Sequence, residues 1–333
     1  MENVSTNASE STTDNEAAVI GTITANAVLL LVVFVVTALN LLVIAALIGK
    51  DNSELVLSIR VILINILAAC VLGALGSALY HIFSPIARLV SSATAHEASL
   101  CSANVFLLTT SSSGRILFTA FYGVAVFIVV RCWSRPVLAP RNTKYFILAS
   151  AVLWLLAVAT AGINALFIVY QSLSGICSNR IQESQNTSYS ISLAIASPYL
   201  AVSCIPIIIT PIILIETSCY VKRKTITEHK DTKKALVNFG LFLIIVQAFN
   251  AFAHICIPLL GIIGIHILQR NSSLVFTVAV ALSDLSRIPT STLILIFFKP
   301  VRLKVRRWIC RCFLDCHAFK QEQTGPNIIS VQL

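Results

Sequence analysis

The sequence predicts an all-α integral membrane protein, a bundle of seven transmembrane helices followed by a short helix at the membrane surface. Three observations predict it: the composition, seven long apolar runs, and basic residues gathered on one side of those runs. Of 333 residues, 57% are hydrophobic and 11% are charged, whereas soluble domains carry about 25% charged residues. The net charge of +10 does not indicate nucleic-acid binding, because the basic residues fall between apolar runs rather than on the face of a soluble module.

Each apolar run is long enough to cross about 30 Å of hydrocarbon as a helix rising 1.5 Å per residue. The runs span 26–48, 58–80, 104–130, 145–169, 191–220, 235–263 and 274–298. We expect helices because a chain in lipid must satisfy its own backbone hydrogen bonds, and the runs lack the alternating polarity of barrel strands. The first run is predicted to be a retained helix rather than a signal peptide, since it is long, lacks a basic leader and is followed by Lys50.

Lysine and arginine in short loops favour the cytoplasmic side of a membrane, which fixes the expected orientation. They gather in the first, third and fifth predicted loops and after the last run, whereas the opposite side holds Arg88, Arg180 and Arg270. The amino terminus is therefore predicted to be extracellular, with residues 1–25 as a glycosylated tail. Glycosylation sequons start at Asn3, Asn7, Asn186 and Asn271, all on that side. The last lies in a very short loop, so we predict modification of the first three.

Cysteine positions add two predictions. Cys101 and Cys177 are the two cysteines placed on the outer side, where disulfides persist, and we predict that they pair. Cys310, Cys312 and Cys316 lie in a basic segment beside the membrane and are candidates for reversible palmitoylation. No cysteine spacing is typical of a zinc site, so no metal is expected.

The segment 299–316 after the seventh run is predicted to be an amphipathic helix on the inner leaflet. Apolar residues recur there at helical spacing, at Val301, Val305, Trp308 and Cys312, with basic residues between them. Anionic lipid favours each nearby basic residue by roughly 1 kcal/mol. The membrane bundle is thus expected to span 26–298, and residues 317–333 to form a flexible cytoplasmic tail.

This layout resembles a G-protein-coupled receptor of the rhodopsin-like class over about residues 20–316. The matching residues occur in the family's order: Asn40, Asn65 to Ala69, Trp154, Pro211 with Tyr220, Pro258 and Pro289. Four family positions differ, which indicates either a distant member of the family or a convergent protein. Cys70 stands where the family usually has an aspartate, Val130-Arg131-Cys132 replaces Asp-Arg-Tyr, Cys256 replaces a tryptophan, and Ile288-Pro289-Thr290-Ser291-Thr292 replaces Asn-Pro-x-x-Tyr.

The resemblance implies that Arg131, at the inner end of the third helix, meets a heterotrimeric G protein when the sixth helix moves outward. The family's neighbouring acid is absent, and Glu216 is a possible resting partner. The alternative is that Glu216 is a solvated charge at a helix end. Further contacts to the G protein are expected from the basic loop that includes Lys222, Arg223 and Lys224.

The sequence limits the chemical class of the ligand mainly by exclusion. The seventh run has no lysine, so it offers no Schiff base to retinal, and the third run has no acid to pair with an amine. By position, the outer pocket would be lined by Thr109, Ser113, Leu117, Ser203, Leu260, Val278 and Leu282. Each of these could instead be a packing residue. Such a lining favours a small, weakly polar or hydrophobic molecule.

Three charged residues lie inside the predicted spans at a cost of about 2.5 kcal/mol or more each. Asp284 and Arg287 are three residues apart and can share a helix face, and Arg115 lies in the third run. They form either a structural ion pair that extends to Arg115, or a group with a direct role in ligand binding or gating.

The expected function is therefore that of a plasma-membrane receptor that binds a small ligand and activates a G protein, with no enzyme activity and no cofactor. A transporter is the main alternative, but transporters typically show two related halves and broken helices, which the sequence lacks. An intramembrane hydrolase would need a pair of catalytic acids or an activated nucleophile, and Asp284 is the only deeply placed acid.

Overall fold

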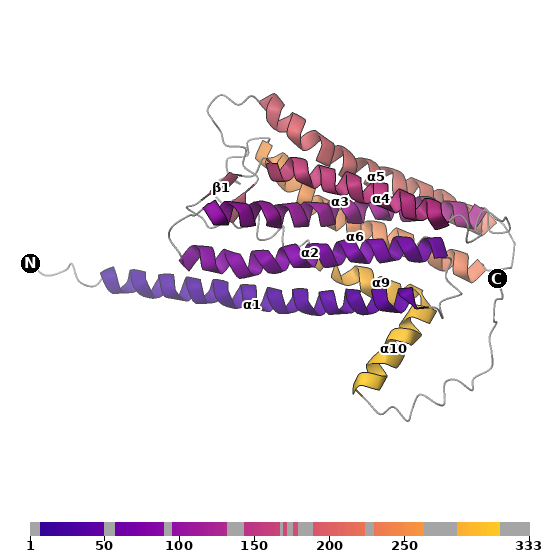
Figure 1. Ribbon diagram of the computed structural model, residues 1–333, viewed down its shortest axis with the longest axis horizontal. Coiled ribbons are helices and arrows are strands. Elements are labelled where there is room, and N and C mark those ends of the chain that lie inside the picture. Colours follow the sequence, from indigo (N-terminus) through magenta and orange to yellow (C-terminus); the bar gives the residue numbers. More distant parts are fainter. Residues whose placement is uncertain are drawn as a thin grey trace, which may run out of the picture.

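The computed structural model describes residues 7–49, 57–89, 95–131, 143–166, 169–171, 176–178, 189–223, 230–262 and 285–313, with side chains described over the central parts of these segments. The helices are α1 (Asn7–Ile48), α2 (Leu57–Leu89), α3 (Ala95–Arg131), α4 (Thr143–Leu166), α5 (Tyr189–Arg223), α6 (Lys230–Ile262), α9 (Ile288–Phe297) and α10 (Lys299–Phe313). The helices α1 to α6 run along the long axis of the molecule, and α10 turns away from the bundle at one end (Figure 1).

A short antiparallel hairpin joins α4 to α5. It consists of β1 (Val169–Gln171) and β2 (Ile176–Ser178), with Tyr170 opposite Cys177. Both strands contact α3. The all-α prediction is therefore right for the bundle and incomplete for this loop, because three-residue strands leave no periodic signal in an otherwise irregular stretch.

Six described helices contain an apolar stretch long enough to cross a membrane. The stretches are Thr24–Ile48, Leu57–Ile82, Phe106–Arg131, Lys144–Ile163, Ala201–Arg223 and Asp231–Ala251. The prediction of a multi-pass membrane protein is thus supported by length and composition. The predicted seventh span, 274–298, is described only from residue 285 onward, where α9 is a shorter apolar helix. The number seven stays a prediction.

The helix α1 begins at Asn7, well inside the segment 1–25 that was expected to be a tail. The apolar stretch itself begins at Thr24, close to the predicted residue 26. The helix therefore continues for several turns beyond the part that is apolar enough for lipid.

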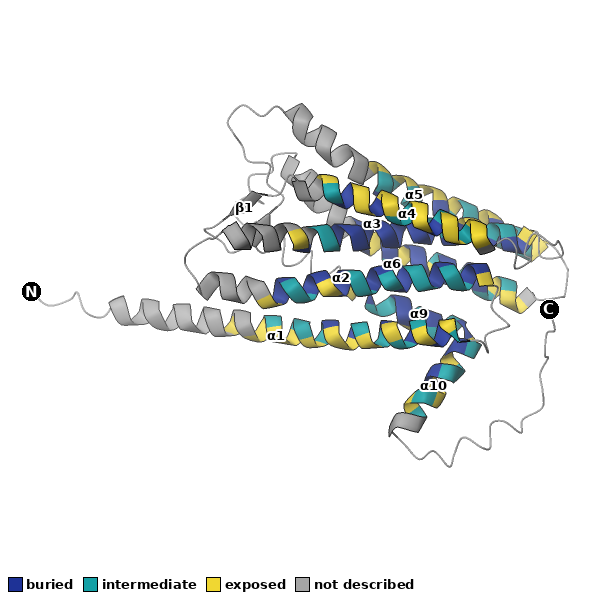
Figure 2. Cartoon of the chain, viewed as in Figure 1, coloured by how far each residue is buried: buried dark blue, intermediate teal, exposed yellow. Residues whose placement is uncertain are grey.

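Burial places α3 at the centre of the bundle. In its apolar stretch 72% of the residues are buried, against 22% in those of α1, α4 and α5. The outer helices instead expose large apolar side chains, such as Phe34 on α1, Leu155 on α4 and Ile208 on α5. Figure 2 shows the contrast between the dark central helix and the mixed outer ones. Helices that are apolar on their outer face suit lipid rather than water.

An aromatic cluster links α3, α6 and Phe298, the residue between α9 and α10. The ring of Phe239 on α6 lies 5.2 Å from that of Tyr122 and 5.1 Å from that of Phe298. Tyr122 also donates a hydrogen bond to the backbone oxygen of Leu236, at 3.0 Å. These contacts hold α6 against α3 near the end of the bundle where α10 begins.

The helix α10 is amphipathic in the structure, as its sequence predicted. Val301 and Val305 are buried, whereas Arg302, Arg306 and Arg307 are exposed. The chain leaves helical geometry at Phe298 (φ −109°, ψ 89°), which separates α10 from α9. The helix packs on α1 and α9, so its apolar side is used partly for docking to the bundle.

Candidate functional site

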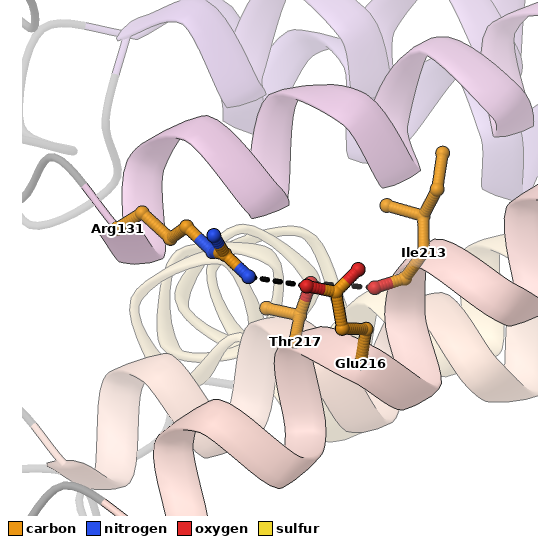
Figure 3. Close-up of polar contacts among 4 residues, drawn as sticks. All are labelled: Arg131, Ile213, Glu216 and Thr217. Carbon is orange, nitrogen blue, oxygen red and sulfur yellow. Dashed lines mark hydrogen bonds and ion pairs between the residues drawn. The ribbon is translucent and has the colours of Figure 1, made fainter.

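An ion pair joins α3 to α5 at the end of the bundle where both helices finish. Arg131 is the last residue of α3, and its Nη2 donates to Oε1 of Glu216 on α5 (Figure 3). The Arg131 guanidinium also lies over two aromatic rings, with its Cζ 4.4 Å from the centre of the Phe127 ring and 5.3 Å from that of Tyr220. The arginine is therefore held by one charge and by two ring faces, which attract cations.

Both partners of this ion pair are partly open to the surroundings, with 39% of the Arg131 side chain and 58% of the Glu216 side chain exposed. An exposed ion pair contributes about 0.2–1 kcal/mol. The contact is thus strong enough to bias two arrangements of the helices and too weak to lock one. The sequence left open whether Glu216 pairs with Arg131 or is a separately solvated charge. In the structure the two residues are paired.

Close packing of α3 on α5 sets the distance that the ion pair spans. A β-carbon added at Gly123 of α3 would lie 2.6 Å from Cγ2 of Thr210 on α5, closer than side chains pack. Beside Glu216, the hydroxyl of Thr217 donates to the backbone oxygen of Ile213 at 2.6 Å (Figure 3). Lys222 and Arg223 are exposed in the last turn of α5, at the same end, and Lys224 lies outside the described residues.

A second polar site lies in the middle of the bundle, around Arg115 of α3, which is fully buried. Its Nη1 donates to Oγ of Ser286 at 2.8 Å, and its Nη2 donates to Oδ1 of Asn250 on α6. The Asn250 amide in turn donates to Oγ of Ser112 at 3.0 Å. One arginine therefore ties α3 to α6 and to the turn before α9.

Arg287, which is 1% exposed, extends this polar site to α2. Its Nη1 donates to Oγ of Ser77 at 2.7 Å. A β-carbon at Gly73, also on α2, would lie 2.2 Å from Oγ of Ser111 and 2.9 Å from Nε of Arg287. The glycine is needed there because both side chains lie directly on the α2 backbone.

Cys70 is fully buried and lies beside both arginines and Thr290. Next to it along the chain, the Ala69 backbone oxygen accepts a 2.7 Å hydrogen bond from Ser111. We name this group the polar core: Cys70, Ser77, Ser111, Ser112, Arg115, Asn250, Ser286, Arg287 and Thr290.

The structure only partly covers the predicted group of Arg115, Asp284 and Arg287. The two arginines lie in one polar core, as expected, while Asp284 lies outside the described residues. The hydrogen-bond partners of the two arginines include two serines and an asparagine, all neutral, which the sequence analysis missed. Asn250 gave a usable signal, because an amide inside an apolar run is costly unless it is hydrogen-bonded.

The residues expected to line a ligand pocket are buried where they are described. Thr109, Ser113 and Leu117 lie on α3 and Ser203 on α5. Leu260 lies on α6 with its side chain outside the described part, and Val278 and Leu282 fall outside the described residues. The structure thus places four of them in the bundle interior and does not test their role.

A small cavity of about 10 Å³ lies nearby, between α3, α5 and α6. Its lining consists of Ile116, Thr119, Pro206, Ile207, Thr210, Ile244 and Gln247. It has room for one water molecule, and the buried Gln247 amide, which makes no hydrogen bond, is its main polar group.

Several predicted modifications fall at or beyond the limits of the described side chains. Cys101 is in α3 and Cys177 in β2, and Asn7 begins α1, but the side chains of all three lie outside the described part. Asn3 and Asn186 lie outside the described residues altogether. Cys310 is partly buried on α10, the Cys312 side chain is not among those described, and Cys316 lies beyond α10.

Within the part of the chain that the structure describes, no three histidine, cysteine or acidic residues come together as metal ligands. No protein-family model matches the sequence, and a comparison with curated proteins finds no match.

Proposed function

We propose that this protein is a divergent rhodopsin-like receptor that binds a small ligand in the bundle and activates a heterotrimeric G protein. The observation that carries the proposal is the contact of Arg131 with Glu216 at the end of α3 and α5. An arginine held by an exposed acid and two rings at a helix end is a contact that helix movement can break and remake. A purely structural arginine would gain more from a buried partner.

The proposed mechanism is a shift between two states. In the resting state Glu216 holds Arg131 against α5. Ligand binding between α3, α5 and α6 shifts α6 away from α3, Arg131 leaves Glu216, and its guanidinium becomes available to the G protein together with Lys222 and Arg223. Because the exposed pair contributes about 0.2–1 kcal/mol, the active state is populated without ligand, which gives basal signalling.

The proposed ligand is small and weakly polar or hydrophobic. Support comes from the buried hydroxyls of Thr109, Ser113 and Ser203 together with the buried apolar side chain of Leu117. Such a site rewards apolar surface and a few hydrogen bonds. A compound of this kind can arrive from the extracellular medium or from the lipid.

The proposal requires an extracellular amino terminus at the plasma membrane and a cytoplasmic Arg131. An epitope tag placed before Asn7 should be stained by antibody on intact cells, and a tag after residue 333 should be stained only after permeabilisation. The reverse pattern would place Arg131 outside the cell and contradict coupling to a G protein. A panel of weakly polar compounds, read by G-protein dissociation in the same cells, then searches for the ligand, with Arg131→Ala as the uncoupled control.

A further inference from the structure

The cavity between α3, α5 and α6 contains one side chain whose hydrogen-bonding groups are unused. Gln247 of α6 is 1% exposed and lines the cavity. Within the part of the chain that the structure describes, neither Nε2 nor Oε1 of Gln247 makes a hydrogen bond. Burying an amide without partners is costly, and most buried side-chain polar atoms have at least one. The Gln247 amide therefore indicates that the cavity receives a hydrogen-bonding group.

The two threonine hydroxyls of the lining are already used within their own helices. Thr119 donates to the backbone oxygen of Arg115 at 2.7 Å, and Thr210 donates to that of Pro206 at 2.5 Å. Each hydroxyl has used its one proton and can only accept a further bond. The other lining residues are apolar: Ile116, Pro206, Ile207 and Ile244. Gln247 is thus the only side chain of the lining that can donate to a bound group.

The α5 side of the cavity lies just beneath the lipid-facing surface. Pro206 and Ile207 are partly exposed, and their neighbours Ile205 and Ile208 are exposed apolar side chains. Backbone hydrogen bonding is also incomplete there, because Pro211 has no N–H to donate to the backbone oxygen of Ile207. Helices bend most readily at proline. A molecule dissolved in the hydrocarbon can therefore reach the cavity between α5 and α6.

The size and chemistry of the cavity favour a hydroxyl group on an apolar molecule. A volume of about 10 Å³ admits one group of the size of a water molecule. The amide of Gln247 offers an acceptor and two donors side by side, and a hydroxyl group both donates and accepts. The apolar walls and the nearby lipid favour a hydrocarbon body over a second polar group.

We propose that this cavity is a binding site for a small alcohol that enters from the lipid. Its hydroxyl donates to Oε1 of Gln247 and accepts from Nε2, while its hydrocarbon chain lies between α5 and α6 along Pro206 and Ile207. None of the residues predicted to line the receptor pocket lines this cavity. The site does not rest on the proposed function, because its occupancy can be measured without a G protein.

The first test is thermal unfolding of the purified full-length protein in phosphatidylcholine nanodiscs, a lipid without a hydroxyl group. Hexanol is compared with its isomer dipropyl ether, which accepts a hydrogen bond and cannot donate one. A ligand that binds only the folded state raises the melting temperature as its concentration passes its dissociation constant. The proposal predicts a higher melting temperature in hexanol than in the ether at equal concentration in the membrane. Equal melting temperatures overturn it.

Two variants separate the Gln247 amide from a general effect of alcohol on the bilayer. Gln247→Leu removes the unpaired amide at similar volume, so without alcohol it should be at least as stable as the unmodified protein. It should also lose the difference between hexanol and the ether. Asn238→Leu makes a similar exchange at a partly exposed position of α6 and should keep the difference. A difference that survives in Gln247→Leu contradicts the proposal.

Photolabelling of the unmodified protein decides the question if Gln247→Leu fails to fold. An alkanol that carries a diazirine on its chain is photolysed in the nanodiscs, and the labelled residues are located by mass spectrometry. We expect labels on Pro206, Ile207 or Ile244, which excess hexanol reduces and excess dipropyl ether does not. Labels that spread over the exposed faces of α1 and α4 and resist competition by hexanol overturn the proposal.

Discussion

At the scale of single residues, Asn250 is the neutral acceptor on which buried Arg115 depends. Its Oδ1 accepts from the arginine while its Nδ2 donates to Ser112. Asn250→Ala removes both bonds, and the loss of a hydrogen bond to a buried charged group costs about 1.5–3 kcal/mol. We expect a large fall in melting temperature and in surface expression. Asn238→Ala on the same helix, at a partly exposed position, is the control, and equal losses in both variants would argue against a special role for Asn250.

Gly73 gives a second test at this scale. A β-carbon there would lie 2.2 Å from Oγ of Ser111 and 2.9 Å from Nε of Arg287, closer than side chains pack. Gly73→Ala should therefore destabilise the protein despite the better helix propensity of alanine. Gly162→Ala on α4 is matched, since nothing lies within 4 Å of an added β-carbon there, and it should be neutral or stabilising by up to about 1 kcal/mol. Melting curves that rank the two variants in the opposite order would contradict the packing described for α2.

At the scale of elements, the contact between α3 and α6 is the one that the proposed activation has to change. Tyr122 donates to the Leu236 backbone oxygen at 3.0 Å and packs on Phe239. Tyr122→Phe keeps the ring and removes a bond of about 1 kcal/mol, so α6 should move more readily and basal G-protein dissociation should rise. The control is Tyr145→Phe on the exposed face of α4. Unchanged basal dissociation in Tyr122→Phe would show that this bond does not restrain α6.

Most of the helices could be predicted from the sequence, because a membrane helix is a long and continuous run of apolar residues. The buried side of α10, which includes Val301 and Val305, could also be predicted, because these apolar residues recur at helical spacing. The hydrogen-bond partners of the buried arginines could not be predicted. Arg115 and Ser286 are 171 positions apart, and only the packing of three helices brings them together. Glu216 was identified as a possible partner of Arg131, since both could be placed at one end of the bundle by counting along their helices.

At the scale of the whole molecule, two polar groups join the helices of the described part of the bundle. The polar core joins α2, α3, α6 and the turn before α9, whereas the Arg131 contact lies at the end of α3 and α5. Tyr122 and Phe239 of the aromatic cluster lie on α3 and α6, two helices that the polar core joins. A shift of α6 relative to α3 would therefore change contacts at both, which is the physical basis that we propose for signalling through the bundle.

The most direct test of this account is basal G-protein dissociation in cells that express the unmodified chain, Glu216→Gln or Arg131→Ala at equal surface levels. Glu216→Gln removes the charge that holds Arg131 and should raise basal dissociation above that of the unmodified chain, by up to about fivefold for a contact of up to about 1 kcal/mol. Arg131→Ala should reduce dissociation to that of cells without the protein. Equal dissociation in all three, at the level of untransfected cells, would contradict the claim that the contact of Arg131 with Glu216 controls a G protein.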